Sequence, residues 1–349
     1  MNTTAAYRMS TIITERPSVP RRRTFHPVDW PSFKQDWQQA RGSVSLSSSY
    51  IASEFIDDDD DDEEEEKAVD ASYGPVEAIK RIFTVFPVRD AAWITAMAFI
   101  LGSISFTVAS VLTILPLLFP PLEFPGRKEV AFPAALTIGS ACFFTGGNLA
   151  TFGAFNVNRG PIPDDQSLDK AKSHGHQRPP SYNPALLGSE EWVWFPGWTE
   201  FRSKYLSNPA FCGGLIAMFG GYILSSSTII GFPGVLDEKA PDFIHQLNRF
   251  VMTPLIIGAS LLGTGAFVLT LVVQEKWYKP ELANVAWHSS FWNVAAAAWL
   301  VASAALTILR PDQELNSAIA SNVSSLAFDV AASLQLYMLM QHYPRHRSD

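Results

Sequence analysis

Asp329 is the residue of this sequence best placed to do chemistry, because it lies near the middle of a long apolar stretch. A carboxyl group inside lipid is unfavourable unless it is protonated, paired or facing water. Asp329 is therefore either an ion or proton site, or a carboxyl group that hydrogen-bonds to polar neighbours such as Asn148, Asn293 or Ser333. We take Asp329, Asn148 and Asn293 as a candidate intramembrane polar site.

The histidines offer weaker chemistry. His174 and His176 form an H-x-H pair in a polar segment, without carboxylates or cysteines placed to complete a metal site. His288 adjoins Trp287 at the start of an apolar stretch, where an imidazole among aromatic side chains is typical of an interfacial anchor rather than a catalytic base.

The positions of the cysteines and the absence of known catalytic motifs argue against an enzyme. Cys142 and Cys212 both lie in apolar stretches, so we expect neither a disulfide framework nor a cysteine-based zinc site. The chain has no G-x-S-x-G elbow, no Gly-rich phosphate loop, no H-E-x-x-H and no set of histidine boxes. We therefore predict no metal, no cofactor, no nucleic-acid partner and no enzymatic activity.

Six long apolar stretches must position these residues. Crossing a hydrocarbon core takes about 20 apolar residues in a helix, and runs this long without alternation are helices. The sequence predicts an all-α, polytopic membrane helix bundle of three hairpins, whose spans cover about residues 91–115, 131–155, 209–230, 250–273, 285–309 and 322–340.

Small residues recur at four-residue spacing in three of the spans. Lipid tails are as apolar as leucine, so helices associate where small side chains let their backbones approach. Such a stripe is consistent with contact inside one bundle and equally with the face of a homo-oligomer. The predicted packing residues are Gly213, Ala217, Gly221, Ala98, Gly102, Ala259 and Gly263.

A weak internal repeat appears when the chain is shifted by 119 residues. Gly139 and Gly146 then align with Gly258 and Gly265, and Gly102 aligns with Gly221. The shift spans two crossings, so a duplication would give repeats of the same orientation. Chance matches are common in apolar sequence, and both interpretations stay open.

The long connection 156–208 ends in an aromatic-rich segment from about residue 190 to 206, with apolar residues at helical spacing. This pattern predicts an amphipathic helix in the headgroup layer of the cytosolic leaflet. A sugar or nucleotide site is the alternative. The predicted interfacial anchors are Trp192, Trp194, Trp198, Trp277, Tyr278, Trp287 and His288.

Residues 1–75 form a polar tail ahead of the membrane domain at 76–349. The formal charge of the whole chain is −8, but ten acids lie in one run at 57–66, and the rest of the chain carries +2. A segment with so little apolar surface cannot offset its ordering entropy, so we predict disorder. The acidic run is either a solvated spacer or a docking site for a basic cytosolic protein.

The distribution of basic residues predicts the orientation. Connections on the side of the tail carry 13 Lys and Arg, whereas those on the opposite side carry five. The positive-inside rule then places both termini in the cytosol. Which membrane holds the protein stays open.

Several short motifs stand out along the apolar part of the chain. They are the Q-E-K-W-Y-K-P connection at 274–280, Trp287-His288, residues 291–293, the Trp-rich block at 194–196, residues 335–337 and Tyr343-Pro344. With these motifs the chain resembles a group of uncharacterised multi-pass integral membrane proteins of filamentous fungi. The resemblance covers roughly residues 80 to 345 and implies the six-span layout, but no activity. Leu336 and Met338 depart from a Q-W-Y-E pattern in the last span of that group.

Three functional hypotheses follow. The first is a non-enzymatic membrane protein that organises membrane lipid or partner proteins. The second is a small-solute or ion/proton transporter in which Asp329 titrates. The third is an intramembrane lipid-modifying enzyme, which requires polar residues from several helices, here Asn148, Asn293 and Asp329, to converge on one cavity.

Overall fold

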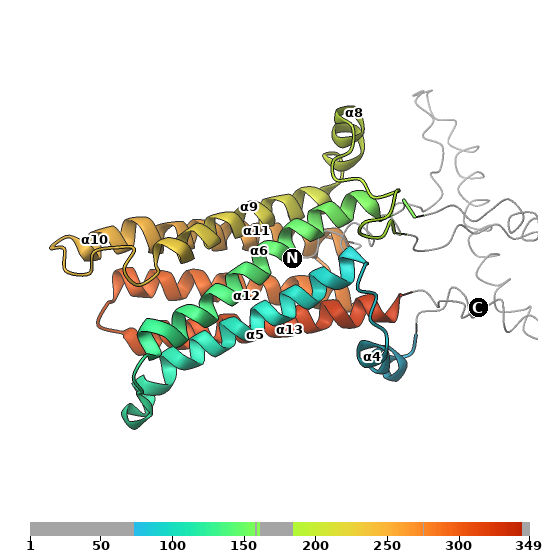
Figure 1. The fold of residues 1–349 in the computed structure, drawn as a ribbon. Helices are drawn as coiled ribbons and strands as arrows, with labels where there is room; N and C mark the ends of the chain where they lie inside the picture. Colours follow the sequence, from blue (N-terminus) through green and yellow to red (C-terminus); the bar gives the residue numbers. More distant parts are fainter. Residues whose placement is uncertain (1–72, 158, 161–183, 275, 344–349) are drawn as a thin grey trace, which may run out of the picture. The chain divides into compact units, whose positions relative to one another are not determined.

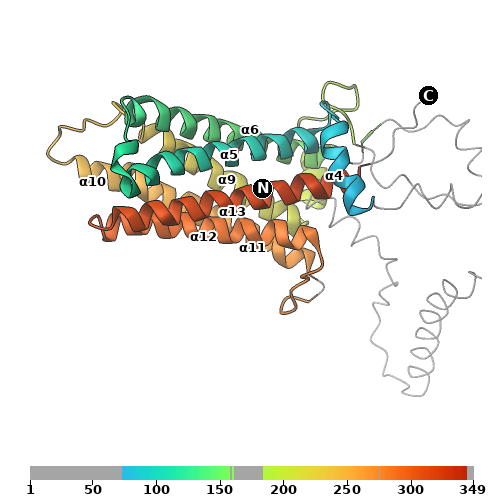
Figure 2. The same cartoon turned by 90° about the horizontal axis from the view of Figure 1, so that it is seen from below.

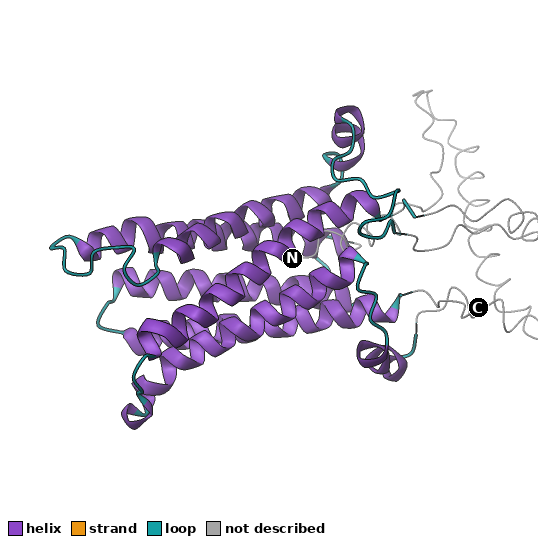
Figure 3. Cartoon of the chain, viewed as in Figure 1, coloured by secondary structure: helices purple, strands orange, loops and turns teal. Residues whose placement is uncertain are grey.

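The computed structural model describes residues 73–157, 159–160, 184–274 and 276–343, and every regular element in these ranges is a helix (Figures 1 and 3). All of these residues belong to one of the two compact units into which the chain divides. Residues 1–72 of the predicted disordered tail, which include the acidic run at 57–66, lie outside the described residues. Most of the polar half of the long connection, with His174 and His176, lies outside them as well.

The described ranges contain six helices that are long and apolar enough to cross a membrane. The prediction of an all-α, six-helix membrane bundle is therefore confirmed at the level of length and composition. These helices are α5 (Ala91–Leu118), α6 (Phe132–Asn156), α9 (Pro209–Ile230), α11 (Thr253–Val273), α12 (Val285–Leu309) and α13 (Glu314–Gln341).

The predicted limits of α9 and α12 match the structure, whereas α13 begins eight residues before the expected Asn322. Two other helices are preceded by further helical turns. The π-helical η2 (Arg127–Ala131) leads into α6, and α10 (Phe243–Leu247) and the π-helical η4 (Asn248–Met252) lead into α11. Pro133 and Pro254 lie just inside the α-helices, and a wide turn before each proline relieves the clash of its ring with the preceding turn.

The six helices form a ring in chain order. Each packs against its neighbours in the order α5, α6, α9, α11, α12 and α13, and α13 closes the ring against α5. Figures 1 and 2 show all six running side by side. The Tyr73 N–H donates to the Gln341 carbonyl (3.0 Å), so both ends of the described chain lie at one end of the ring. We call this the Tyr73 end, and the opposite end, where α13 begins, the Glu314 end.

Glycines hold α9 against α11. A Cβ atom added to Gly220 would lie 2.6 Å from the Gly258 carbonyl oxygen, and one added to Gly213 would lie 3.1 Å from that of Gly265. The two contacts are seven residues apart on each helix, the spacing expected when two antiparallel helices stay in contact along one face. The two backbones are therefore too close for larger side chains.

Serine and alanine form the corresponding seam between α12 and α13. Ser289 donates its hydroxyl to the Ala331 carbonyl (3.0 Å), and Ser324 donates to the Ala296 carbonyl (2.7 Å). One further heptad towards the Glu314 end, the hydroxyl of Ser303 donates to the Ser317 carbonyl (2.9 Å). The interhelical bonds satisfy these hydroxyls inside the protein, as an apolar surrounding demands.

The α5–α6 hairpin uses glycine against phenylalanine. Phe99 covers Gly146, and Phe106 covers Gly139, again at a spacing of seven residues. The 119-residue shift aligns these two glycines with Gly258 and Gly265, which lie at the contact of the α9–α11 hairpin. The aligned glycines thus serve both hairpins, but they face phenylalanine in one and glycine in the other.

The predicted small-residue stripes differ in what they contact. Gly213 and Ala217 face α11, so this part of the stripe is used inside the ring rather than at the face of a homo-oligomer. Gly221 does not share the contact, since a Cβ added there meets nothing within 4 Å. Its neighbour Gly220 is the packing residue, because a step of one residue turns a helical position away from its partner. Of the others, Ala98 and Gly102 face α6, Gly263 faces Ala297, and Ala259 is fully buried.

Two short helices lie at the Tyr73 end. The sequence did not predict α4 (Pro75–Thr84), which packs on α13 and begins within the segment assigned to the tail. The predicted amphipathic helix is present in a shorter form, as α8 (Trp198–Glu200) continued by the π-helical η3 (Phe201–Tyr205).

We expect Gly220→Ala to destabilise the protein and Gly221→Ala to leave its stability unchanged or slightly raised. Forcing a Cβ against a helix backbone costs about 1–3 kcal/mol, whereas the Gly221 position has open space. Both variants gain the same helix propensity, so each controls for the other. Thermal unfolding of the purified protein in detergent checks this, and equal transition temperatures would contradict the close α9–α11 contact.

Candidate functional site

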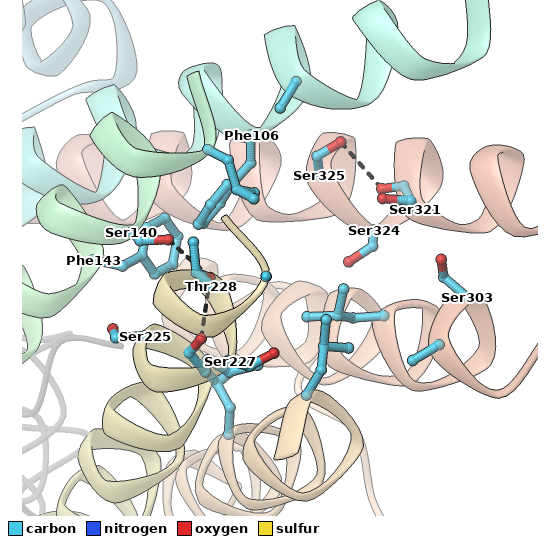
Figure 4. A pocket seen from close by; sticks show the side chains of 18 of the residues that line it. Phe106, Ser140, Phe143, Ser225, Ser227, Thr228, Ser303, Ser321, Ser324 and Ser325 are labelled. Carbon is cyan, nitrogen blue, oxygen red and sulfur yellow. Dashed lines mark hydrogen bonds between the residues drawn. The ribbon is translucent and has the colours of Figure 1, made fainter. Parts of the chain in front are cut away.

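A cavity of about 470 Å³ lies inside the ring. All six long helices contribute to its wall, which extends from Phe99 and Gly214 in the interior to Glu314 at the start of α13. Figure 4 shows part of this wall, with side chains from several helices around the same space. A ring of six helices leaves more central space than a bundle of four, and here the side chains fill only part of it.

Aromatic side chains close the ring below the cavity, at the Tyr73 end. Phe155 of α6 lies edge-on to Tyr205 (ring centroids 4.9 Å apart), and Tyr205 also contacts Phe211 of α9 (5.4 Å). Met340 and Tyr343 complete this buried cluster. Tyr205 comes from η3, so the helix predicted to lie at the membrane surface also inserts a residue into the core. Burial raises the pKa of Tyr205 above its ordinary value.

Phenylalanines form the middle of the cavity wall. Phe143 of α6 lies 5.2 Å from both Phe99 and Phe106 and 5.5 Å from Phe328 of α13, measured between ring centroids. All four rings line the cavity. This surface favours an apolar ligand, because burying hydrocarbon is the main gain available here.

Hydroxyl groups supply most of the polar surface of the wall. Ser227 donates to the Val251 carbonyl (2.7 Å), Ser225 donates to the Gly221 carbonyl (2.9 Å), and Ser140 bonds to Thr228 (3.2 Å). Because their protons are already engaged, these hydroxyls have lone pairs to offer but few free donors. The wall therefore suits a largely apolar molecule with few polar atoms.

Charge is confined to the rim of the cavity. Among the described residues of the wall, the only carboxylate is that of Glu314, which is exposed, and no lysine, arginine, histidine or cysteine contributes. No group of three or more metal-ligating side chains occurs within the described ranges of the chain either. The cavity therefore has little means of compensating a buried charge on a ligand.

Asp329 lies on the seam that closes the ring, not on the cavity wall. Thr107 of α5 donates its hydroxyl to Asp329 Oδ2 (2.6 Å), while Oδ1 is enclosed and has no hydrogen-bond partner among the described residues. One turn further, the hydroxyls of Ser110 and Ser325 are 2.9 Å apart, and Asn322 donates to Ser110 (3.0 Å). Polar contacts near the middle of the span thus join the first long helix to the last.

The three residues of the predicted polar site do not bond to one another in the structure. Asn148 accepts a hydrogen bond from the hydroxyl of Tyr222, a wall residue (2.5 Å), but does not itself line the cavity. Asn293 is buried and donates to the Ser289 carbonyl of its own helix (2.9 Å). Each residue has a partner other than Asp329, and the convergence that the hypothesis of a lipid-modifying enzyme requires is not seen in the described part of the chain.

The predicted interfacial anchors divide into two groups. Trp194, Trp198, Trp277 and Tyr278 are exposed at the Tyr73 end, where they can meet lipid. Trp192 and Trp287 are instead buried, contrary to an anchoring role. Trp192 packs with Ala91 and Ala185, and Trp287 stacks on Phe291 (5.0 Å). His288 is half-buried and hydrogen-bonded to the Leu282 carbonyl (2.7 Å).

The hydroxyls of the wall and the partner of Asp329 were not predicted from the sequence. Ser303, Ser317 and Ser324 follow the heptad spacing of the α12–α13 seam, which was a usable signal. Thr107 gave no such signal. The same helix contains Thr113, which bonds only to a carbonyl of its own helix, and the sequence does not distinguish the two threonines.

In comparisons with known proteins, no family model, curated protein or solved structure matches the chain. The resemblance to fungal membrane proteins therefore stays an expectation.

We expect Thr107→Val and Asp329→Leu to lower stability by roughly 0.5–2 kcal/mol each, the range found for polar contacts between membrane helices. Asp329→Asn keeps an acceptor oxygen for Thr107 and should stay close to the parent protein. The double variant Thr107→Val/Asp329→Leu should lose less than the sum of the single losses. Unfolding in detergent titrated with dodecyl sulfate measures these differences.

Thr113→Val is the matched control, because Thr113 bonds only within its own helix (3.1 Å to the Ala109 carbonyl). If Asp329→Asn were as destabilising as Asp329→Leu, the carboxyl group itself rather than an acceptor oxygen would be required, and the structural role assigned to Asp329 would fail.

Proposed function

We propose that this chain is a non-enzymatic multi-pass membrane protein that binds a membrane lipid, or the hydrocarbon part of one, in the cavity inside its helix ring. The observation that carries this proposal is the cavity of about 470 Å³, walled by phenylalanines and by hydroxyls that bond within the protein. Ligand pockets of about 300–1,000 Å³ with a mainly apolar lining and a few polar groups are typical of small-molecule sites.

The position of the cavity supports a ligand that comes from the membrane. The wall reaches the Glu314 end of the ring, where Glu314 is exposed, whereas the aromatic cluster around Tyr205 closes the other end. Phe144 of the wall is itself exposed and lies beside Tyr222 of α9 (5.2 Å between ring centroids). A lipid tail could therefore enter between α6 and α9.

Chemistry of the wall supports binding without catalysis. A serine nucleophile needs a base within hydrogen-bond reach. Ser227 and Ser324 of the wall donate instead to backbone carbonyls, and Ser303 donates to the Ser317 carbonyl. These hydroxyls can position a ligand, but their contacts do not activate them.

We assign the Tyr73 end to the cytosolic side, which places both termini in the cytosol. The basic residues Lys80, Arg89, Lys204, Lys276 and Lys279 all lie in segments at this end, and the positive-inside rule supports the assignment. The cavity then opens towards the opposite face. The acidic run at 57–66 would be available to a basic cytosolic protein.

The test of lipid binding is photolabelling in phosphatidylcholine vesicles that contain a phosphatidylcholine with a diazirine in its acyl chain. We expect labels on wall residues such as Ser321 and Phe328 as well as on the outward-facing Leu326 and Val330. Ser225→Trp should fill the cavity and suppress labelling of the wall severalfold, because Ser225 lines it.

Ser226→Trp is the control, because Ser226 is the next residue on the same helix and is exposed. Its wall labels should match those of the parent protein. Labels confined to outward-facing residues in the parent protein would contradict lipid binding in the cavity.

Transport of an ion or proton through Asp329 is a second candidate, favoured by the enclosed and unpartnered Oδ1 atom. Transport predicts that Asp329→Asn abolishes the pH dependence of flux in proteoliposomes. Fluxes of protons, sodium and potassium that equal those of the parent protein at every pH would exclude the candidate.

A further inference from the structure

The short helix α4 presents three different faces. Its inner face packs on the bundle through Ala78, which is fully buried, and through Ile82, which contacts the aromatic cluster at the Tyr73 end. Arg81 on the same face donates from Nη1 to the Tyr343 carbonyl (2.8 Å), and its guanidinium lies over the Tyr73 ring (3.8 Å). These contacts fix the rotation of α4 about its own axis.

With α4 held in this way, an apolar stripe faces outwards. Val76, Ile79 and Phe83 follow a spacing of three and four residues, so they lie on one side of the helix. They are 82%, 51% and 72% exposed, values unusual for such side chains beside a well-packed core. Phe86 and Val88, in the link to α5, are exposed as well.

A polar stripe runs beside the apolar one. Glu77 and Lys80 form an exposed ion pair (3.8 Å), and Thr84 follows them at helical spacing. An apolar stripe next to a charged stripe is the pattern of helices that lie in the plane of a membrane surface.

The position of α4 matches this pattern. Figure 2 shows α4 crossing the direction of the long helices at the Tyr73 end, where the membrane-spanning helices end. If the long helices cross the membrane, a helix in this place runs parallel to the membrane surface. Its apolar stripe then lies at the depth where hydrocarbon meets the headgroups.

Other parts of the ring expose apolar side chains at the same end. α4 rests on α13, Trp194 and Phe195 rest on Phe152 of α6, and Trp277 lies in the connection between α11 and α12. Three separate sectors of the ring therefore carry such surfaces. One partner protein or a second copy would cover a single sector, whereas a lipid leaflet surrounds all of them.

We infer that α4 is an in-plane membrane anchor, and that its Val76, Ile79 and Phe83 stripe inserts into the lipid leaflet at the Tyr73 end. Binding of α4 to the leaflet is driven by apolar contact rather than by charge. The only basic residue on the outer faces of α4 is Lys80, which already pairs with Glu77. The partner is thus a phospholipid surface irrespective of its charge. This inference rests on the membrane placement of the six helices and not on a ligand in the cavity.

The experiment attaches an environment-sensitive nitrobenzoxadiazole group to single cysteines in the full chain, with Cys142 and Cys212 replaced by alanine. The labelled positions are Ile79→Cys and Phe83→Cys on the apolar stripe and Lys80→Cys and Thr84→Cys on the polar stripe. All four side chains lie on the outside of α4, and each pair differs by one residue, so the variants are matched in folding and in labelling.

In phosphatidylcholine vesicles we expect the dye at 79 and 83 to emit at shorter wavelength and to be quenched by phosphatidylcholine brominated near the headgroup. The dye at 80 and 84 should be quenched severalfold more strongly by aqueous iodide. Adding phosphatidylserine should change none of these values.

Equal quenching by iodide at all four positions would show that α4 lies in water and would overturn the inference. Protection from iodide at 79 and 83 without quenching by brominated lipid would show that protein covers the stripe, and would overturn it as well.

Discussion

Close antiparallel contact between small residues, repeated every seven positions, is the constraint on which this structure depends. Lipid offers no hydrophobic drive for helices to associate, so association requires backbones near enough for dispersion and for interhelical hydrogen bonds. Gly213 and Gly220 meet Gly265 and Gly258 in this way, and Ser289, Ser303 and Ser324 bond to α13 or α12. These contacts join two of the three hairpins, and the α5–α6 hairpin, in which phenylalanine covers glycine, completes the ring.

Closing the ring creates both the polar seam and the cavity. The first and last long helices meet through Thr107 and Asp329, so a carboxyl group near the middle of a span acquires a partner. The aromatic cluster around Tyr205 and Phe211 fills the centre at the Tyr73 end. At the Glu314 end the inward residues are mainly serine, threonine and alanine, which are too small to fill the space between six helices.

The sequence predicted the six helices because the thickness of the hydrocarbon core dictates the length of an apolar span. It placed α13 too late, because the polar residues around Ser317 lower the hydropathy there, although they face Ser303 across the seam. It also missed α4, whose ten residues carry too little apolar length to signal a span. Gly221 and Thr107 show the deeper limit, since hydropathy does not reveal which helix a given face will meet.

Native mass spectrometry can show whether the helix ring encloses a membrane lipid. Collisional activation strips lipids from the outer surface of a membrane protein before it removes a lipid enclosed between helices. If the cavity holds a lipid, a species one lipid heavier than the chain should persist after the outer lipids are lost. Loss of every lipid adduct at one activation energy, leaving only the bare chain, would contradict it.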